Sequence, residues 1–156
     1  MKVKQNKSGE DNMSLFARKE DLPEQMKGRV IVTGETLMMQ IVTEVPKPGE
    51  EEVPPHRHNE EQLGYILEGE CELEIETNHP PAANWGSCPD KFIGQPSEKR
   101  ILKAGDFFRI PAGALHRLKI IGNKPVSWIA AYHPIRPDYL PKAVRLESKH
   151  KPLPFK

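Results

Sequence analysis

Three histidines stand at positions that could assemble a metal site. His56 and His58 flank Arg57, and His116 follows much later in the chain. Residues i and i+2 of a strand project to the same face, so a strand here would direct both imidazoles to one point and turn Arg57 away. Imidazole is a common ligand of first-row divalent metals, and three imidazoles with one oxygen donor leave positions open for water or substrate. The sequence therefore predicts one divalent transition metal, for which Zn, Ni, Mn and Fe all remain candidates.

Two neighbouring side chains compete for the oxygen position. Glu61 carries a full negative charge, whereas Gln62 offers a neutral amide oxygen. Gln62 shares the strand parity of His56 and His58, and Glu61 has the opposite parity, so parity favours Gln62. A neutral ligand would leave a divalent site at about +2 rather than about +1. We expect such a site to hold its metal less tightly and to act as a stronger Lewis acid.

The two segments that contain these histidines also contain glycines and prolines at characteristic positions. In this pattern they resemble the paired motifs of the cupin superfamily. The matching positions are Gly49, His56, His58, Gln62 and Gly69 in the first motif, and Gly105, Pro111, Gly113 and His116 in the second, where Ile120 replaces the usual Asn. The resemblance implies an all-β fold, an antiparallel jelly roll (double-stranded β-helix) in which two sheets form one barrel. It also implies the metal ligands His56, His58, Gln62 and His116, with Gln62 standing where Glu is usual.

A closer resemblance rests on two longer runs. The chain from His56 to Gly69 reads His-x-His-x-x-Glu-Gln-x-Gly-Tyr-x-Leu-x-Gly, and from Tyr132 to Leu140 it reads aromatic-x-Pro-x-Arg-x-Asp-Tyr-Leu. Both runs look like the small single-domain cupins of pectin and alginate degradation, which convert unsaturated monouronates to linear keto sugars. In that group an Asp, a Phe and an Arg of the second region help the metal act on the sugar.

The chain departs from that group at one of these three positions. By position, Tyr132 takes the Phe place and Arg136 the Arg place, but Ala130 stands where the Asp is expected. Without that acid, we expect weak or no activity on unsaturated uronates. Arg136 could clamp a substrate carboxylate, or it could pair with Asp138.

The remaining pocket residues follow from strand parity. Gly64 shares parity with Gln62, and its missing side chain would either leave room for a small molecule or permit a bulge. Tyr65, Tyr132 and Arg136 are the candidate catalytic residues, with a tyrosine or a water on the metal moving the proton. We expect the pocket to be lined by Gly64, Phe107 or Phe108, Leu118, Tyr132 and Arg136.

Alternating and β-rich runs predict the strands that position these residues. They cover 29–33, 36–45, 70–76, 100–102, 107–110, 115–121 and 126–132. Gly34-Glu35 should form a two-residue type II′ turn between the first two. In the run 70–76, Cys71, Leu73 and Ile75 should point inward while the glutamates form a solvated face.

Length and composition predict one domain with two appendages. The 156 residues divide into an N-terminal arm (1–20), a barrel (21–140) with an inserted loop (78–99), and a basic C-terminal tail (141–156). The loop could be a lid over the barrel mouth or could pack on its exterior. Cys71 and Cys88 are expected to be reduced thiols. Each arm lacks a core of its own, and together they favour a homodimer.

The bulk properties argue against two classes of partner. A formal net charge of +1 gives no reason to expect nucleic-acid or membrane binding, and no apolar run approaches the roughly 18 residues of a membrane span. The N-terminus lacks the apolar core of a secretory signal, so we expect a cytoplasmic protein.

Three functions from different classes fit these observations. The first is a metal-dependent lyase, isomerase or ring-opening enzyme that acts on a small oxygenated acid or sugar. The second is an iron-dependent dioxygenase, because histidine-rich sites with open positions also bind dioxygen. The third is a non-catalytic protein in which the metal anchors a small-molecule ligand. The identity of the metal would distinguish the first two.

Overall fold

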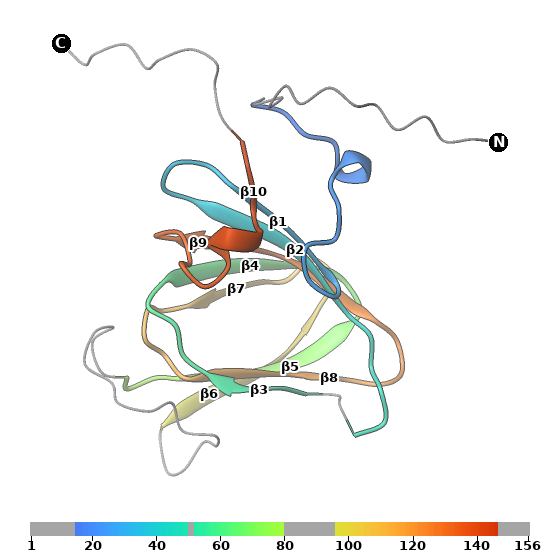
Figure 1. Ribbon diagram of the computed structural model, residues 1–156. Helices are drawn as coiled ribbons and strands as arrows, with labels where there is room; N and C mark the ends of the chain where they lie inside the picture. The colour runs from blue at the N-terminus through green and yellow to red at the C-terminus, as the bar shows by residue number, and fades with distance from the viewer. Residues whose placement is uncertain (1–14, 50–51, 80–95, 147–156) are drawn as a thin grey trace.

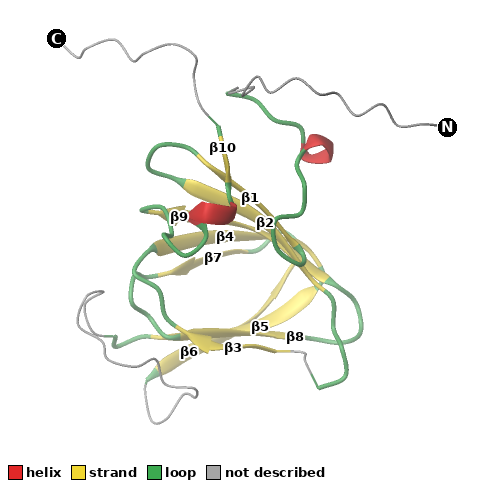
Figure 2. Cartoon of the chain, in the orientation of Figure 1, coloured by secondary structure: helices red, strands yellow, loops and turns green. Residues whose placement is uncertain are grey.

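Two β-sheets face each other across a shared core in the computed structural model, which describes residues 15–49, 52–79 and 96–146 (Figures 1 and 2). The six-stranded sheet has the order β10-β1-β2-β9-β4-β7, and the four-stranded sheet has the order β3-β8-β5-β6. Every strand pair is antiparallel except β1 with β10, which is parallel. The predicted all-β, two-sheet jelly roll is confirmed.

The strands are short and follow the alternating runs of the sequence. The larger sheet contains β1 (Arg29–Thr33), β2 (Met38–Glu44), β4 (Glu61–Glu68), β7 (Phe107–Ile110), β9 (Val126–His133) and β10 (Val144–Arg145). The smaller sheet contains β3 (Glu52–His56), β5 (Glu70–Glu76), β6 (Ser97–Lys103) and β8 (His116–Ile120). Two 3-10 turns, η1 (Lys19–Asp21) and η2 (Leu140–Lys142), precede β1 and β10. No helix among these residues is long and apolar enough to cross a membrane.

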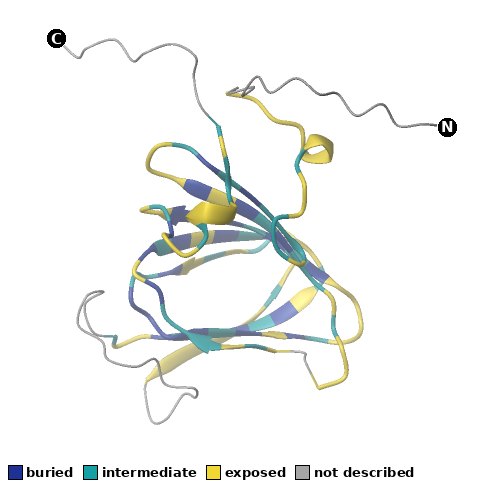
Figure 3. Cartoon of the chain, in the orientation of Figure 1, coloured by how far each residue is buried: buried dark blue, intermediate teal, exposed yellow. Residues whose placement is uncertain are grey.

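The core lies between the sheets because alternate residues of each strand point inward. In β9, Val126, Trp128 and Ala130 are buried, while their neighbours along the strand are half-buried. Leu118 and Ile120 of β8 face them from the smaller sheet and belong to the same apolar cluster. Figure 3 shows this burial along the strands of both sheets. Full burial of one large aliphatic side chain stabilises a fold by about 1.5–3 kcal/mol, so this cluster is the main support of the barrel.

The connection between β1 and β2 is longer than predicted. The prediction of a two-residue turn at Gly34-Glu35 was wrong. Residues 34–37 separate the two strands, and the Gly34 N–H donates to the Leu37 carbonyl at 2.9 Å. Gly34 also lacks the positive φ that a type II′ turn requires at its first central position.

Two predicted boundaries also shift. β6 contains the predicted strand 100–102 but begins at Ser97, inside the predicted loop 78–99, because its first residues are polar and exposed and gave no apolar signal. The predicted tail from 141 contributes η2 and then β10, whose Val144 and Arg145 pair with β1. Residues 80–95, which include Cys88, lie outside the described residues, so the lid and exterior alternatives for this loop both stay predictions, as does the domain division.

The glutamate face of β5 is not uniformly solvated, contrary to the prediction. Cys71 and Leu73 point inward as expected, but Glu74 and Glu76 are only 6% and 3% exposed. Glu74 accepts a hydrogen bond from Arg117 at 2.7 Å, and Glu76 pairs with Arg57. Arginines contributed by distant segments cover these carboxylates, which is why alternation within one strand could not reveal their burial.

Candidate metal centre

The three histidines converge at one end of the barrel. Each of His56, His58 and His116 has a ring nitrogen, and these nitrogens all lie within 4.8 Å of one another. The ring centroids of His56 and His116 are 4.2 Å apart, and those of His58 and His116 are 4.9 Å apart. Three nitrogen donors at this separation can ligate a single ion.

Strand pairing and a turn bring the imidazoles together. His56 ends β3 and is the direct antiparallel partner of His116, the first residue of β8. His58 lies beyond the end of β3, so it does not share a strand face with His56 as the sequence argument assumed. It is nevertheless buried and points to the same place because the chain turns there into β4.

Each imidazole is oriented by a hydrogen bond between its Nδ1 and a backbone carbonyl. The acceptors are Pro54 for His56 at 2.9 Å, Glu60 for His58 at 2.8 Å, and Ala114 for His116 at 2.9 Å. A carbonyl can only accept, so Nδ1 carries the proton in all three rings. The lone pair is then on Nε2, which is the tautomer that a metal requires.

The surroundings also keep the histidines uncharged. Burial lowers the pKa of His58 to about 4 and, with the backbone bond opposing it, lowers the pKa of His56. Burial and the neighbouring His56 hold the pKa of His116 well below its ordinary value. Neutral imidazole is the metal-binding form, so the site is prepared for an ion at neutral pH.

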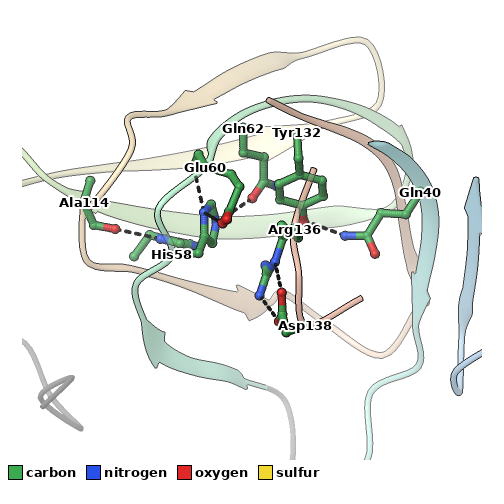
Figure 4. Close-up of polar contacts among 9 residues, drawn as sticks. Gln40, His58, Glu60, Gln62, Ala114, Tyr132, Arg136 and Asp138 are labelled. Carbon is green, nitrogen blue, oxygen red and sulfur yellow. Dashed lines mark hydrogen bonds and ion pairs between the residues drawn. The ribbon is translucent and has the colours of Figure 1, made fainter. Parts of the chain in front are cut away.

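The structure separates the two candidates for the oxygen ligand. Gln62 is buried, with its Oε1 3.2 Å from Nε2 of His58 (Figure 4). Glu61 points the other way, to the outer face, where its partly exposed carboxylate pairs with Arg109. Glu60, which the sequence analysis passed over, is buried with a carboxylate oxygen 3.7 Å from Nδ1 of His58, and burial raises its pKa. Gln62 therefore lies beside His58 and lines the cavity, and its role as the fourth ligand stays a prediction.

The Arg57 side chain connects the two segments that contain the histidines, although Arg57 is not itself a candidate ligand. It turns away from the imidazoles, as expected, and its Nη1 lies 2.5 Å from Oε2 of Glu76. The same Nη1 donates to the Gly113 carbonyl at 2.8 Å, and Glu76 Oε2 accepts from the Leu115 N–H at 3.1 Å. One buried ion pair thus fixes the turn before His116 against the segment that bears His56 and His58.

The imidazoles open onto a cavity of about 260 Å³ between the sheets. Its apolar walls come from both sheets, and its polar groups are two arginines, two glutamines, two tyrosines and two of the three histidines. None of the described residues that line it is an aspartate or a glutamate. The lining consists of Arg29, Gln40, Val53, Pro54, His56, Gln62, Leu73, Phe108, Ile110, His116, Leu118, Trp128, Tyr132, Arg136 and Tyr139.

Arg136 forms the expected pair with Asp138 and also lines the cavity, while its role as a carboxylate clamp stays a prediction. It donates to Asp138 from Nε at 3.1 Å and from Nη2 at 2.6 Å, and it also lines the cavity while being only 8% exposed. Its guanidinium carbon lies 4.1 Å from the ring centroid of Tyr139 and 5.3 Å from that of Tyr132. The ion pair and the two rings hold the cation in place beside the imidazoles.

The expectations for Gly64 and Tyr65 fail, and the alternative between Phe107 and Phe108 is decided. Gly64 offers no free space, because a Cβ built on it would lie 2.0 Å from a ring carbon of Phe108. Phe108 lines the cavity, whereas Phe107 is 78% exposed. Tyr65 is not among the lining residues and packs against Phe107, with tilted rings whose centroids are 4.7 Å apart, so its candidate catalytic role is not supported. Leu118 and Tyr132 line the cavity as expected.

Two polar residues of the cavity wall lie outside both motifs and were not predicted from the sequence. Arg29 opens β1 and Gln40 lies in the middle of β2, far from either motif. The sequence offered one signal, a single polar residue among inward-facing apolar ones. Gln40 has the same strand parity as the buried Met38 and Val42, and it is 1% exposed. A buried glutamine requires polar partners, which points to a polar wall in that part of the barrel.

Comparison with known proteins agrees with the fold. A family model described as a cupin domain matches residues 42–81. KdgF from Halomonas sp. is 26% identical with a TM-score of 0.55, and the match covers 80% of this chain and 98% of that one. An RmlC-like cupin from Shewanella frigidimarina is 20% identical with a TM-score of 0.58, covering 80% and 94% of the two chains.

Longer proteins match over part of their length only. The chain spans 53% of Peruvianin-I from Thevetia peruviana latex, at 17% identity, 65% coverage of this chain and a TM-score of 0.49. No curated protein sequence gives a significant match. The cupin-domain model over residues 42–81 and the similar solved structures therefore agree with the two-sheet barrel and with the cupin resemblance of the two histidine motifs.

Proposed function

We propose that this protein is a metal-dependent enzyme that acts on a small oxygenated acid or sugar, by lyase, isomerase or ring-opening chemistry. The observation that carries the proposal is the cavity itself. His56 and His116 line it together with the cation of Arg136, and the described residues of its wall include no carboxylate. Such a cavity favours an anionic or polyhydroxylated molecule over a cation.

The residues present fit a divalent ion. Three neutral imidazoles with Nε2 free, and the Gln62 amide oxygen beside them, form a donor set typical of zinc, nickel, manganese or iron. A bound ion would supply Lewis acidity toward a carbonyl or hydroxyl oxygen of the substrate. With no protein carboxylate among these donors, the positive charge of the ion stays largely uncompensated, which suits proton-transfer chemistry.

The protein side chains would orient the substrate and exclude water. Arg136 is held by Asp138 and can direct its remaining N–H groups to a substrate carboxylate. Phe108, Leu118 and Trp128 form apolar walls that strengthen these polar contacts by excluding solvent. Both effects position the reacting atoms before chemistry begins.

Tyr132 is a proton donor rather than a base in this arrangement. Burial raises its pKa to about 12, so its hydroxyl stays protonated at neutral pH. Ala130 is buried and contributes no acid, in contrast with the uronate-linearising cupins that the sequence resembles. We therefore expect little or no turnover of unsaturated uronates.

The test is a substrate screen on protein loaded with each candidate metal. Uronates, sugar acids and hydroxy or keto acids would be incubated with the wild type, and products would be followed by NMR. Turnover that His56→Ala abolishes and Arg136→Gln strongly reduces would support the proposal. Arg100→Gln is the matched control, because Arg100 is exposed and pairs with Glu98 away from the cavity. Equal turnover in all variants would refute it.

A non-catalytic role is the second candidate, and one observation favours it. The described residues of the cavity wall provide no carboxylate to act as a base, and the tyrosine beside the imidazoles is protonated. In that case the metal would anchor a small acid without converting it. Saturable, metal-dependent binding of a ligand that is recovered unchanged would support this alternative.

A further inference from the structure

The cavity contains a second cation on the side of β1 and β2. Arg29 lines it, and its side chain is 17% exposed. Its Nη2 lies 3.2 Å from Oε1 of Glu44, and its Nη1 donates to Oε1 of Gln40 at 3.4 Å. Glu44 is not among the cavity-lining residues, so the ion pair fixes one edge of the guanidinium from outside the cavity.

A continuous polar wall joins this cation to Arg136. Gln40 donates from Nε2 to the Tyr132 hydroxyl at 2.5 Å, and the Tyr132 ring lies beneath the Arg136 guanidinium (Figure 4). Gln40 and Tyr132 are 1% and 3% exposed, so their positions are fixed by the core. The four side chains come from β1, β2 and β9 and from the segment after β9, and together they form one side of the cavity.

This wall contains more donors than acceptors. The Tyr132 oxygen accepts the Gln40 hydrogen bond, so the phenolic hydrogen needs an acceptor of its own. Both guanidiniums only donate, and Glu44 and Asp138 satisfy their outer edges from outside the cavity. Because buried donors require partners, the wall suits a ligand with several negatively charged or carbonyl oxygens.

We propose that Arg29, with Gln40 and Tyr132, forms a second anion subsite, so that the cavity selects small hydroxylated dicarboxylic acids. In this arrangement Arg136 binds one carboxylate near the imidazoles and Arg29 binds the other at the far end of the polar wall. The inference rests on the proposed function, since it concerns the substrate of the same cavity. It differs from that function in requiring two carboxylates instead of one.

Matched acids test the selection by isothermal titration of metal-loaded protein. Glucarate and gluconate share a six-carbon polyol chain and differ by one carboxylate, and malate and 2-hydroxybutanoate form the corresponding four-carbon pair. We expect the dicarboxylate of at least one pair to bind about ten- to a hundredfold more tightly, the factor of one charge-assisted hydrogen bond. Arg29→Gln should remove this preference by weakening the dicarboxylate much more than the monocarboxylate.

Two further variants separate binding from folding. Arg29→Lys keeps the charge and should retain part of the preference, whereas Glu44→Gln removes the ion-pair partner of Arg29 but keeps the cation, so the preference should persist. Melting temperatures of all variants show whether each one folds.

Each possible result bears on one of the two proposals. If both acids of each pair bind equally to the wild type, or if Arg29→Gln keeps the preference, the subsite is refuted while the proposed function stands. If none of the four acids binds the metal-loaded protein, the subsite is refuted, and the substrate screen with sugars and other acids decides the proposed function separately.

Discussion

At the level of single residues, local hydrogen bonds orient each candidate ligand and fix its tautomer. The bond from Nδ1 to a backbone carbonyl recurs at His56, His58 and His116, although the three residues sit in different local structures. The sequence predicted these ligands from type and spacing. It could not predict that His58 leaves the strand, because the turn into β4 depends on contacts made elsewhere.

Acid should destabilise the metal-free protein. The folded state lowers the pKa of His58 from 6.5 to about 4, so below about pH 6.5 the unfolded chain binds a proton that the folded chain excludes. The corresponding stability is fully present above that pH and is lost as the pH falls toward 4. It amounts to on the order of 3 kcal/mol. Urea unfolding at about pH 7 and about pH 5 measures the change.

Two histidine variants serve as controls for this pH dependence. His58→Gln should make the free energy of unfolding less dependent on pH, whereas His133→Gln should leave the dependence as it is, because His133 is exposed and lies outside the trio. An unchanged slope in His58→Gln would contradict the assignment of the acid sensitivity to the buried imidazole.

Gly64 should be intolerant of a side chain. A Cβ there would meet three ring carbons of Phe108 at 2.0–2.6 Å, so Gly64→Ala must displace that ring from the cavity wall. Overpacking of this kind costs about 1–3 kcal/mol of unfolding free energy. The double variant Gly64→Ala with Phe108→Ala should be less destabilised than the sum of the single changes. Strict additivity in thermal unfolding would show that the two residues do not compete for the space.

At the scale of elements, strand alternation predicted which faces of β8 and β9 point inward, since both strands are regular and half-buried. It failed for β5 and β6. The burial of Glu76 depends on Arg57, which lies nineteen positions earlier in the chain, and the exposed β6 presents no apolar stripe. Pairing across elements is set by the whole fold, so a pattern within one strand carries no information about it.

Loss of the buried pair between Arg57 and Glu76 should loosen both histidine segments. Arg57→Gln leaves a carboxylate buried without its cation, which costs about 3–5 kcal/mol of unfolding free energy. It also frees the Gly113 carbonyl, so metal affinity should fall although no ligand has changed. Arg109→Gln is the matched control, because its pair with Glu61 is solvent-exposed and worth at most about 1 kcal/mol. Equal effects of the two changes on metal affinity would contradict a positioning role for Arg57.

At the scale of the whole molecule, the fold class and the position of the site were predictable because two motifs specify both. The polar wall formed by Arg29 and Gln40 was not, since neither residue stands in a motif and their roles appear only when β1 and β2 close over the cavity. The outer surface of the larger sheet also has exposed apolar side chains. Leu63 and Phe107 are 56% and 78% exposed on the larger sheet.

We predict that the protein is a homodimer, in which a second copy would shield part of this apolar surface. We expect an edge strand near the N-terminus or one of the arms at the interface, and β10 rather than β1 forms that edge of the sheet. Multi-angle light scattering at micromolar concentration should give a mass twice that of the 17.7 kDa chain. A monomeric mass would show that the arms and the sheet face remain solvated.

The central claim is that His56, His58 and His116, with Gln62, hold one divalent ion. Metal analysis by mass spectrometry of protein purified without a polyhistidine tag and then equilibrated with divalent metals tests it most directly. We predict about one ion per chain for the wild type and for the control His133→Ala, and almost none for His116→Ala with the β-sheet circular dichroism retained. A wild type that retains no ion, or a His116→Ala variant that retains as much as the wild type, would contradict the account.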